Sequence, residues 1–211
     1  MNLQEINEEL LQEFEWRCNE IILLKNMVNS CEKEEYIKLI LKMSIPIIYA
    51  HLEGFIVSAC KIILEYLNTL KLSSNDYSEK FIMMAFDKDI KSLSDSQDLE
   101  KKIKYFCRIQ EKLLCQLKFE TKVNVKSNLT FGVLENLCLK FDISSVNFKD
   151  YKDILNQLVN IRNAIAHGEN SYSFESFADI EKYIELFEAL CLDFSKILFN
   201  ILEDKKYKKE K

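Results

Sequence analysis

At 211 residues, the chain is long enough to bury one sizeable hydrophobic core, and one domain is the default expectation. Its 48% hydrophobic and 30% charged residues are ordinary for a soluble globular protein. The formal net charge of −5 argues against a non-specific nucleic-acid binder, so any contact with RNA would need a local patch. Only three glycines and one proline are present, which favours long helices over a turn-rich sheet fold.

The cysteines and the apolar stretches point to a cytoplasmic protein. The seven cysteines are odd in number and form no C-x-x-C pair, so reduced thiols are favoured over a disulfide framework or a zinc ribbon. The first residues form an acidic amphipathic stretch without the pattern of a signal peptide. The longest apolar region, residues 45–64, contains His51, Glu53 and Lys61, so we expect a core helix and not a membrane span.

Apolar residues at helical spacing predict about six to seven helices. They cover residues 3–29, 33–71, 79–93, 98–117, 131–141 and 148–167, with a last helix from about residue 180 to 198. Pro46 should kink or break the second of these helices. The sequence therefore predicts an all-α, single-domain helical bundle over residues 1–204, followed by a basic, disordered tail over residues 205–211.

One short run near the C-terminal end carries candidate chemistry: Arg162-Asn163-Ala-Ile-Ala-His167-Gly168. Arginine offers a fixed cationic fork for phosphate, and histidine exchanges a proton near neutral pH. Helical periodicity places Asn163 and His167 opposite an apolar stripe, with Arg162 at the edge of the stripe. That stripe consists of Ile154, Leu158, Ile161 and Ile165. Spacing alone leaves open a purely structural alternative, in which these polar side chains only form hydrogen bonds at the surface.

The run resembles the signature of the HEPN superfamily, an Arg followed by Asn, Asp or His, three further residues and a His. A second element, residues 49–55 (Tyr-Ala-His-Leu-Glu-Gly-Phe), resembles the Y-A-x-W-E-G-F element of the RiboL-PSP and MAE-type HEPN branch, with Leu52 in place of the tryptophan. Residues 14–21 and 127–129 also fit that branch. The resemblance extends from about residue 10 to residue 190.

The resemblance implies a metal-independent endoribonuclease that forms a homodimer with two motifs at a shared cleft. Many such proteins are toxins or antiviral defence effectors, and an antitoxin or regulatory protein is a further implied partner. In this chain, His167 would be the acid–base group, Arg162 would bind the phosphate, and Asn163 would orient the histidine or the phosphate. The alternative is a non-catalytic HEPN module that binds a partner protein or RNA.

Three further residues have an open or structural interpretation. Glu53 lies one helical turn from Tyr49 and would either face the dimer cleft and pair with Arg162 or be a solvated charge. His51 lies on an apolar stripe, where a buried histidine with one hydrogen bond is favoured over a supporting role in catalysis. Arg17 also lies on an apolar stripe and would need a carboxylate partner if buried. No cofactor and no metal site are expected, since the two histidines are far apart and no H-E-x-x-H motif is present.

Overall fold

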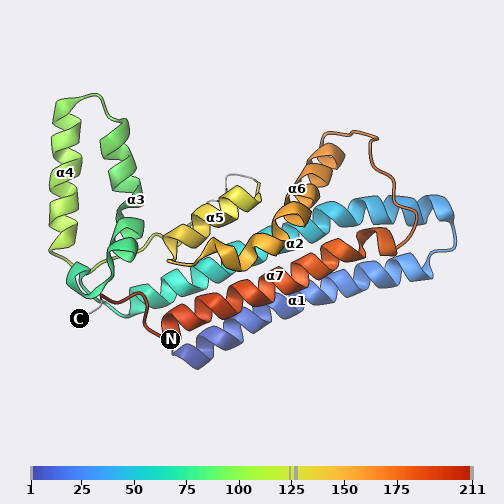
Figure 1. The fold of residues 1–211 in the computed structure, drawn as a ribbon, viewed down its shortest axis with the longest axis horizontal. Coiled ribbons are helices and arrows are strands. Elements are labelled where there is room, and N and C mark those ends of the chain that lie inside the picture. Colours follow the sequence, from blue (N-terminus) through green and yellow to red (C-terminus); the bar gives the residue numbers. More distant parts are fainter. Residues whose placement is uncertain (1, 124, 126–127, 210–211) are drawn as a thin grey trace.

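The computed structural model describes residues 2–123, 125 and 128–209, and the regular elements within this part of the chain are all helical. The longer helices are α1 (Leu3–Ser30), α2 (Glu34–Thr69), α3 (Glu79–Asp95), α4 (Leu99–Leu113), α5 (Phe131–Lys140), α6 (Lys152–Ala166) and α7 (Ala178–Glu203) (Figure 1). Short 3₁₀ helices cover Ser74–Asp76 and Ser145–Tyr151. The predicted all-α fold class is confirmed.

Helix α2 is the centre of the molecule. Helices α1, α2 and α7 lie side by side along the long axis, and α6 packs on α2 from the other side (Figure 1). Among the described residues, α2 is the helix with the length and composition of a membrane span, but 61% of its most apolar window is buried inside the protein. That burial is typical of a core helix in a globular bundle.

Pro46 does not end α2, which continues as helix on both sides of it. A proline inside a helix removes one backbone hydrogen bond and costs about 3 kcal/mol. The neighbouring side chains of Ile45 and Ile48 are fully buried, and burial of each such side chain contributes about 1.5–3 kcal/mol. Tertiary packing therefore outweighs the local penalty, and of the predicted kink or break, the break is absent.

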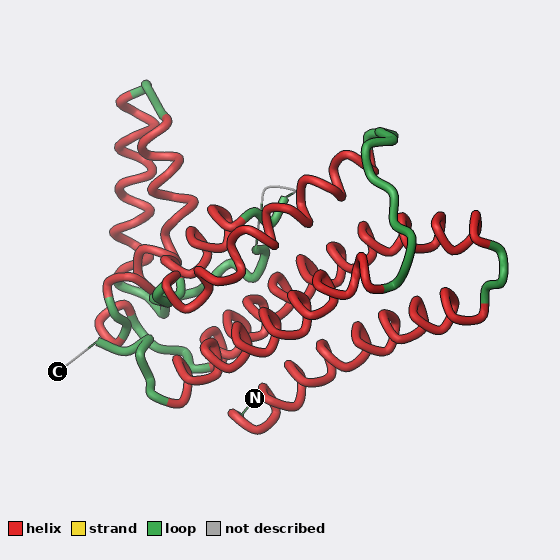
Figure 2. Tube along the Cα trace, turned by 45° about the vertical axis from the view of Figure 1, so that its right-hand side comes forward, coloured by secondary structure: helices red, strands yellow, loops and turns green. Residues whose placement is uncertain are grey.

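Helices α3 and α4 form a hairpin that projects from the bundle (Figures 1 and 2). The Asp98 side chain caps the start of α4 by accepting a hydrogen bond from the backbone N–H of Glu100 (2.9 Å). Helix α4 ends at Leu113, four residues before the predicted end. The chain leaves the helix there because the backbone N–H of Leu117 donates to the carbonyl of Leu72 (2.9 Å), across the base of the hairpin.

The C-terminal segment differs from the prediction of a disordered tail. Within residues 205–209 the Tyr207 side chain is only 3% exposed, and its ring lies 6.0 Å from that of Tyr77. The carbonyl of Tyr207 accepts a hydrogen bond from the backbone N–H of Ser78 (2.9 Å). The packed unit thus extends beyond residue 204, because one aromatic side chain among the lysines has a place in the core. Residues 210 and 211 of the predicted tail lie outside the described residues.

Candidate functional site

Helix α6 carries the Arg162–His167 motif and packs against α2. Its buried face is wider than the predicted stripe and includes Leu155 and Val159 beside Leu158 and Ile161. The predicted stripe members Ile154 and Ile165 are only half-buried. His167 lies opposite this face and is exposed, as the helical periodicity predicts, and Asn163 is half-buried.

A glycine cap ends the helix directly after the motif. Gly168 adopts a positive φ of 76°, a conformation in which a side chain would be strained. The Gly168 N–H donates to the carbonyl of Ile165 (3.0 Å), and the Glu169 N–H donates to that of Ala164 (2.9 Å). This pair of bonds is the Schellman arrangement. It makes His167 the C-cap residue directly after α6, with its side chain in solvent.

The guanidinium of Arg162 is held against α2. Its Cζ lies 4.1 Å from the centroid of the Tyr49 ring, which is a cation–π contact. Its Nη1 donates a hydrogen bond to Oδ1 of Asn163 (2.8 Å). The first two residues of the motif therefore form one unit, in which Asn163 orients the fork of Arg162.

Tyr49 connects this unit to a carboxylate. The Tyr49 side chain is 2% exposed, and its hydroxyl donates to Oε2 of Glu53 while it accepts the backbone N–H of Leu129 (2.6 Å). Burial, with the hydrogen bond to Glu53 as the second cause, raises the pKa of Tyr49 to about 12. The phenol therefore stays protonated at neutral pH and acts as a donor to Glu53.

This placement bears on the two alternatives for Glu53. Its carboxylate accepts the Tyr49 hydroxyl and is not a freely solvated charge. Sequence reasoning did not identify Tyr49 as the partner of Arg162. A signal was present in the spacing: Tyr49 lies four residues before Glu53, for which pairing with Arg162 is one of the two alternatives, and residues four apart share one face of a helix.

Within one chain the motif is split around the helix. Arg162 and His167 are five residues apart, which separates their directions by about 140° at ~100° per residue. Asn163 lies between these two directions. Arg162 faces α2 and His167 faces solvent at the helix end. In the described part of the chain, no three His, Cys, Asp or Glu side chains gather into a set that could hold a metal ion.

The structure does not bring His51 to the motif. Two residues after Tyr49 on α2, it lies on the other side of that helix, 7% exposed, with Trp16 edge-on at 5.5 Å. Its Nε2 lies 3.1 Å from Oε2 of Glu20, an ion-pair distance without hydrogen-bond geometry. Burial lowers the pKa of His51, although the Glu20 carboxylate opposes that shift. The candidate supporting role of His51 therefore has no geometric basis in this structure.

Arg17 has the carboxylate partner that burial requires. Its Nη1 donates to Oε2 of Glu13 (2.6 Å), and its guanidinium lies 4.2 Å from the Trp16 ring centroid. A Cβ atom on Gly54 would lie 3.3 Å from Nη2 of Arg17. The glycine of the 49–55 element thus makes room for the arginine of the 14–21 element, which is a packing role.

One family model matches most of the chain. The model described as RiboL-PSP-HEPN matches residues 12–200, which includes both the 49–55 element and the motif on α6. Comparisons with curated proteins and with solved structures give no significant match. The matched residues cover nearly all of the described bundle, and the chain belongs to the RiboL-PSP-HEPN family.

Proposed function

We propose that the protein is a metal-independent endoribonuclease in which Arg162, Asn163 and His167 form the active site. The observation that carries the proposal is the motif itself. The C-terminal end of α6 carries both an anchored cationic fork, which faces α2, and an exposed histidine beside the glycine cap, in a member of a HEPN family.

The chemistry uses the ribose of the substrate as the nucleophile. A histidine removes the proton of the 2′-hydroxyl, the 2′-oxygen forms a bond to phosphorus, and the bond from phosphorus to the 5′-oxygen breaks. The leaving oxygen takes a proton from a second acid, which yields a cyclic phosphate and a free 5′-hydroxyl. Arg162 binds the non-bridging oxygens, where negative charge increases in the transition state.

A homodimer supplies what one chain lacks. The reaction needs a base and an acid, whereas one motif contains a single histidine. Arg162 and His167 also leave α6 in different directions, so one phosphate does not reach both easily within one chain. In a twofold dimer whose axis lies beside the ends of the two α6 helices, the His167 of one copy would lie near the Arg162 of the other.

A second candidate function is a non-catalytic module that binds a partner protein or RNA. The contacts of Arg162 favour it, because the guanidinium already bonds Asn163 and stacks on Tyr49 within one chain. If these contacts are only structural, the motif would stabilise the packing of α6 on α2 and perform no reaction.

The resemblance also carries the biological part of the proposal. The enzyme acts in the cytoplasm as a toxin or an antiviral defence effector, and an antitoxin or regulatory protein restrains it.

The test is cleavage of total RNA by the purified protein and by His167→Ala, with Glu169→Gln as a matched control. Glu169 is exposed two residues after His167, and among the described residues its side chain accepts a hydrogen bond only from the Ser171 hydroxyl (3.3 Å). We expect fragments with cyclic phosphate ends from the wild type and the control and none from His167→Ala. Equal cleavage by His167→Ala, or a wild type without activity, would favour the second candidate.

A further inference from the structure

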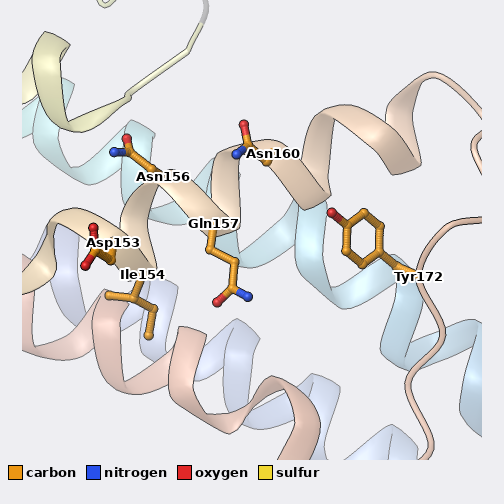
Figure 3. Close-up of a pocket in the computed structure, with 6 residues that line it drawn as sticks. All are labelled: Asp153, Ile154, Asn156, Gln157, Asn160 and Tyr172. Carbon is orange, nitrogen blue, oxygen red and sulfur yellow. The ribbon is translucent and has the colours of Figure 1, made fainter.

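A shallow groove of about 570 Å³ lies on the outer side of α6, next to the motif. It is lined by Asp153, Ile154, Asn156, Gln157, Asn160 and Tyr172. Figure 3 shows Asn156 and Asn160 on the same side of α6, while Tyr172 approaches from the segment between α6 and α7 with its hydroxyl end toward the helix. The groove is therefore lined mainly by amide side chains of α6, with the ring of Tyr172 beside them.

The amides of the groove continue into the motif. Positions 156, 160, 163 and 167 are spaced by four, three and four residues, so they share one face of the helix. This polar face extends over about 16 Å along the axis at ~1.5 Å per residue. An RNA chain that passes His167 can thus continue along the same face of α6 into the groove.

The lining chemistry excludes phosphate as the main ligand of the groove. None of the six lining side chains is cationic, and Asp153 would repel an anion. The ammonium of Lys182 contacts one lining residue, since its Nζ donates to Oε1 of Gln157 (3.1 Å), but Lys182 does not itself line the groove. A ligand that matches the groove must be flat, uncharged and rich in hydrogen-bonding edges.

Existing hydrogen bonds orient two of the amides. Oδ1 of Asn156 accepts the backbone N–H of Phe131 (3.0 Å), which leaves its NH₂ group to donate to a ligand. Gln157 is oriented in the same sense, because its oxygen accepts from Lys182. Asn160 makes no hydrogen bond in the described part of the chain, so it can present both its donor and its acceptor.

We propose that this groove binds the unpaired bases of single-stranded RNA next to the scissile phosphate. Amide side chains read base edges with paired donors and acceptors, a carboxylate accepts from an exocyclic amine, and an aromatic ring stacks on an unstacked base. The Tyr172 ring is 36% exposed and can supply that stacking surface. The inference deepens the proposed function and rests on it, because the scissile phosphate beside the groove is the one that Arg162 and His167 would act on.

The first experiment measures binding without cleavage. Fluorescence anisotropy of labelled single-stranded 12-mer RNAs, one for each base, is followed with His167→Ala protein as the parent. We expect Asn160→Ala and Tyr172→Ala in that parent to weaken binding at least fivefold, while Tyr172→Phe, which keeps the ring, binds as the parent does. The matched controls are Asn7→Ala and Tyr36→Ala, exposed residues of α1 and α2.

Three results of this experiment would overturn the inference. They are unchanged binding in both groove variants, equal losses in the controls, or no binding of any 12-mer by the parent. A change of oligomeric state in Asn160→Ala, with RNA binding intact, would assign the groove to an interface between copies and would also overturn it.

The second experiment separates this inference from the proposed nuclease. The 5′ ends of fragments produced by Asn160→Ala, with His167 intact, are sequenced. We expect cleavage to persist with a changed base preference beside the cut. If the wild type cuts nothing but the binding losses occur, the groove stands and the nuclease proposal fails. If cleavage is active with the same preference and binding is unchanged, the groove inference fails alone.

Discussion

The Cζ atom of Arg162 lies 4.1 Å from the centroid of the Tyr49 ring, so the first residue of the motif is positioned by a helix more than a hundred positions earlier in the chain. The Tyr49 hydroxyl, in turn, donates to Glu53 and accepts from the backbone of Leu129. Tyr49 is thus a positioning residue for Arg162, and α2 contributes to the site through it.

Removal of the Tyr49 hydroxyl should reduce stability more than activity. In Tyr49→Phe the buried N–H of Leu129 loses its acceptor, which costs about 1–3 kcal/mol of unfolding free energy. The ring remains, so Arg162 keeps its stacking surface. Chemical denaturation and RNA cleavage measured together should show the first effect with most of the activity retained. Tyr49→Leu should lose much more activity, and Tyr36→Phe, an exposed control, should change neither quantity. Equal activity in Tyr49→Leu and wild type would contradict the positioning role.

Substitution of His167 should separate activity from stability. Its side chain is exposed, so His167→Ala leaves no core cavity and should change the unfolding free energy by less than about 1 kcal/mol. Loss of the acid–base group should reduce the cleavage rate about 100-fold or more. Arg162→Lys should also impair cleavage, because the ammonium keeps the charge but loses the bidentate fork. Thermal unfolding and a cleavage time course provide the measurement, and an unfolded His167→Ala protein would show a structural role instead.

Activity should require two copies of the chain. Light scattering at micromolar concentration should give twice the mass of the 24.9 kDa chain. Mixing a fixed amount of wild type with an excess of His167→Ala under subunit exchange should lower the cleavage rate, because mixed dimers lack one histidine. A fully active monomer would refute the shared cleft.

Cleavage should persist in a chelator. The proposed chemistry assigns charge stabilisation to Arg162 and proton transfer to His167, so EDTA should leave the rate within about twofold of the untreated protein. A loss of activity that magnesium restores would redirect attention to carboxylates such as Glu53.

Acidification should destabilise the fold through His51. Its pKa is lowered in the folded protein, so the unfolded chain binds the proton more readily. The contribution of His51 to stability is therefore complete above the ordinary histidine pKa of about 6.5 and is lost as the pH falls from there toward the lowered folded value. Denaturation curves between pH 7.5 and 5 should show this loss in the wild type and a smaller one in His51→Gln. Parallel pH dependences in the two proteins would contradict this assignment.

The sequence predicts the helices well because their apolar periodicity is long and regular. The ends of α1 and α2 agree with the predicted ranges to within about two residues, and the glycine cap at Gly168 directly follows the predicted helix over residues 148–167. The exposed position of His167 and the burial of His51 also follow from helical register alone.

The apolar periodicity does not predict which distant segments contact each other. The end of α4 depends on a bond between Leu117 and Leu72, and the order of the C-terminal segment depends on the burial of Tyr207. Likewise, the contact between Arg162 and Tyr49 arises from the packing of α6 on α2. Local pattern cannot specify such pairs, because tertiary burial decides them.

The packing of Tyr207 has a consequence for how the molecule is made. Its ring meets Tyr77 and Phe81, which leave the ribosome about 130 residues earlier at ~5–20 residues per second. For several seconds during synthesis, Tyr77 and Phe81 at the base of the α3–α4 hairpin are already made while Tyr207, which covers them, is not. The paired helices α1 and α2, in contrast, are adjacent in sequence and can associate early. The hairpin base therefore closes fully only after the C-terminal segment has been made, although α3 and α4 are adjacent in sequence and can pair much earlier.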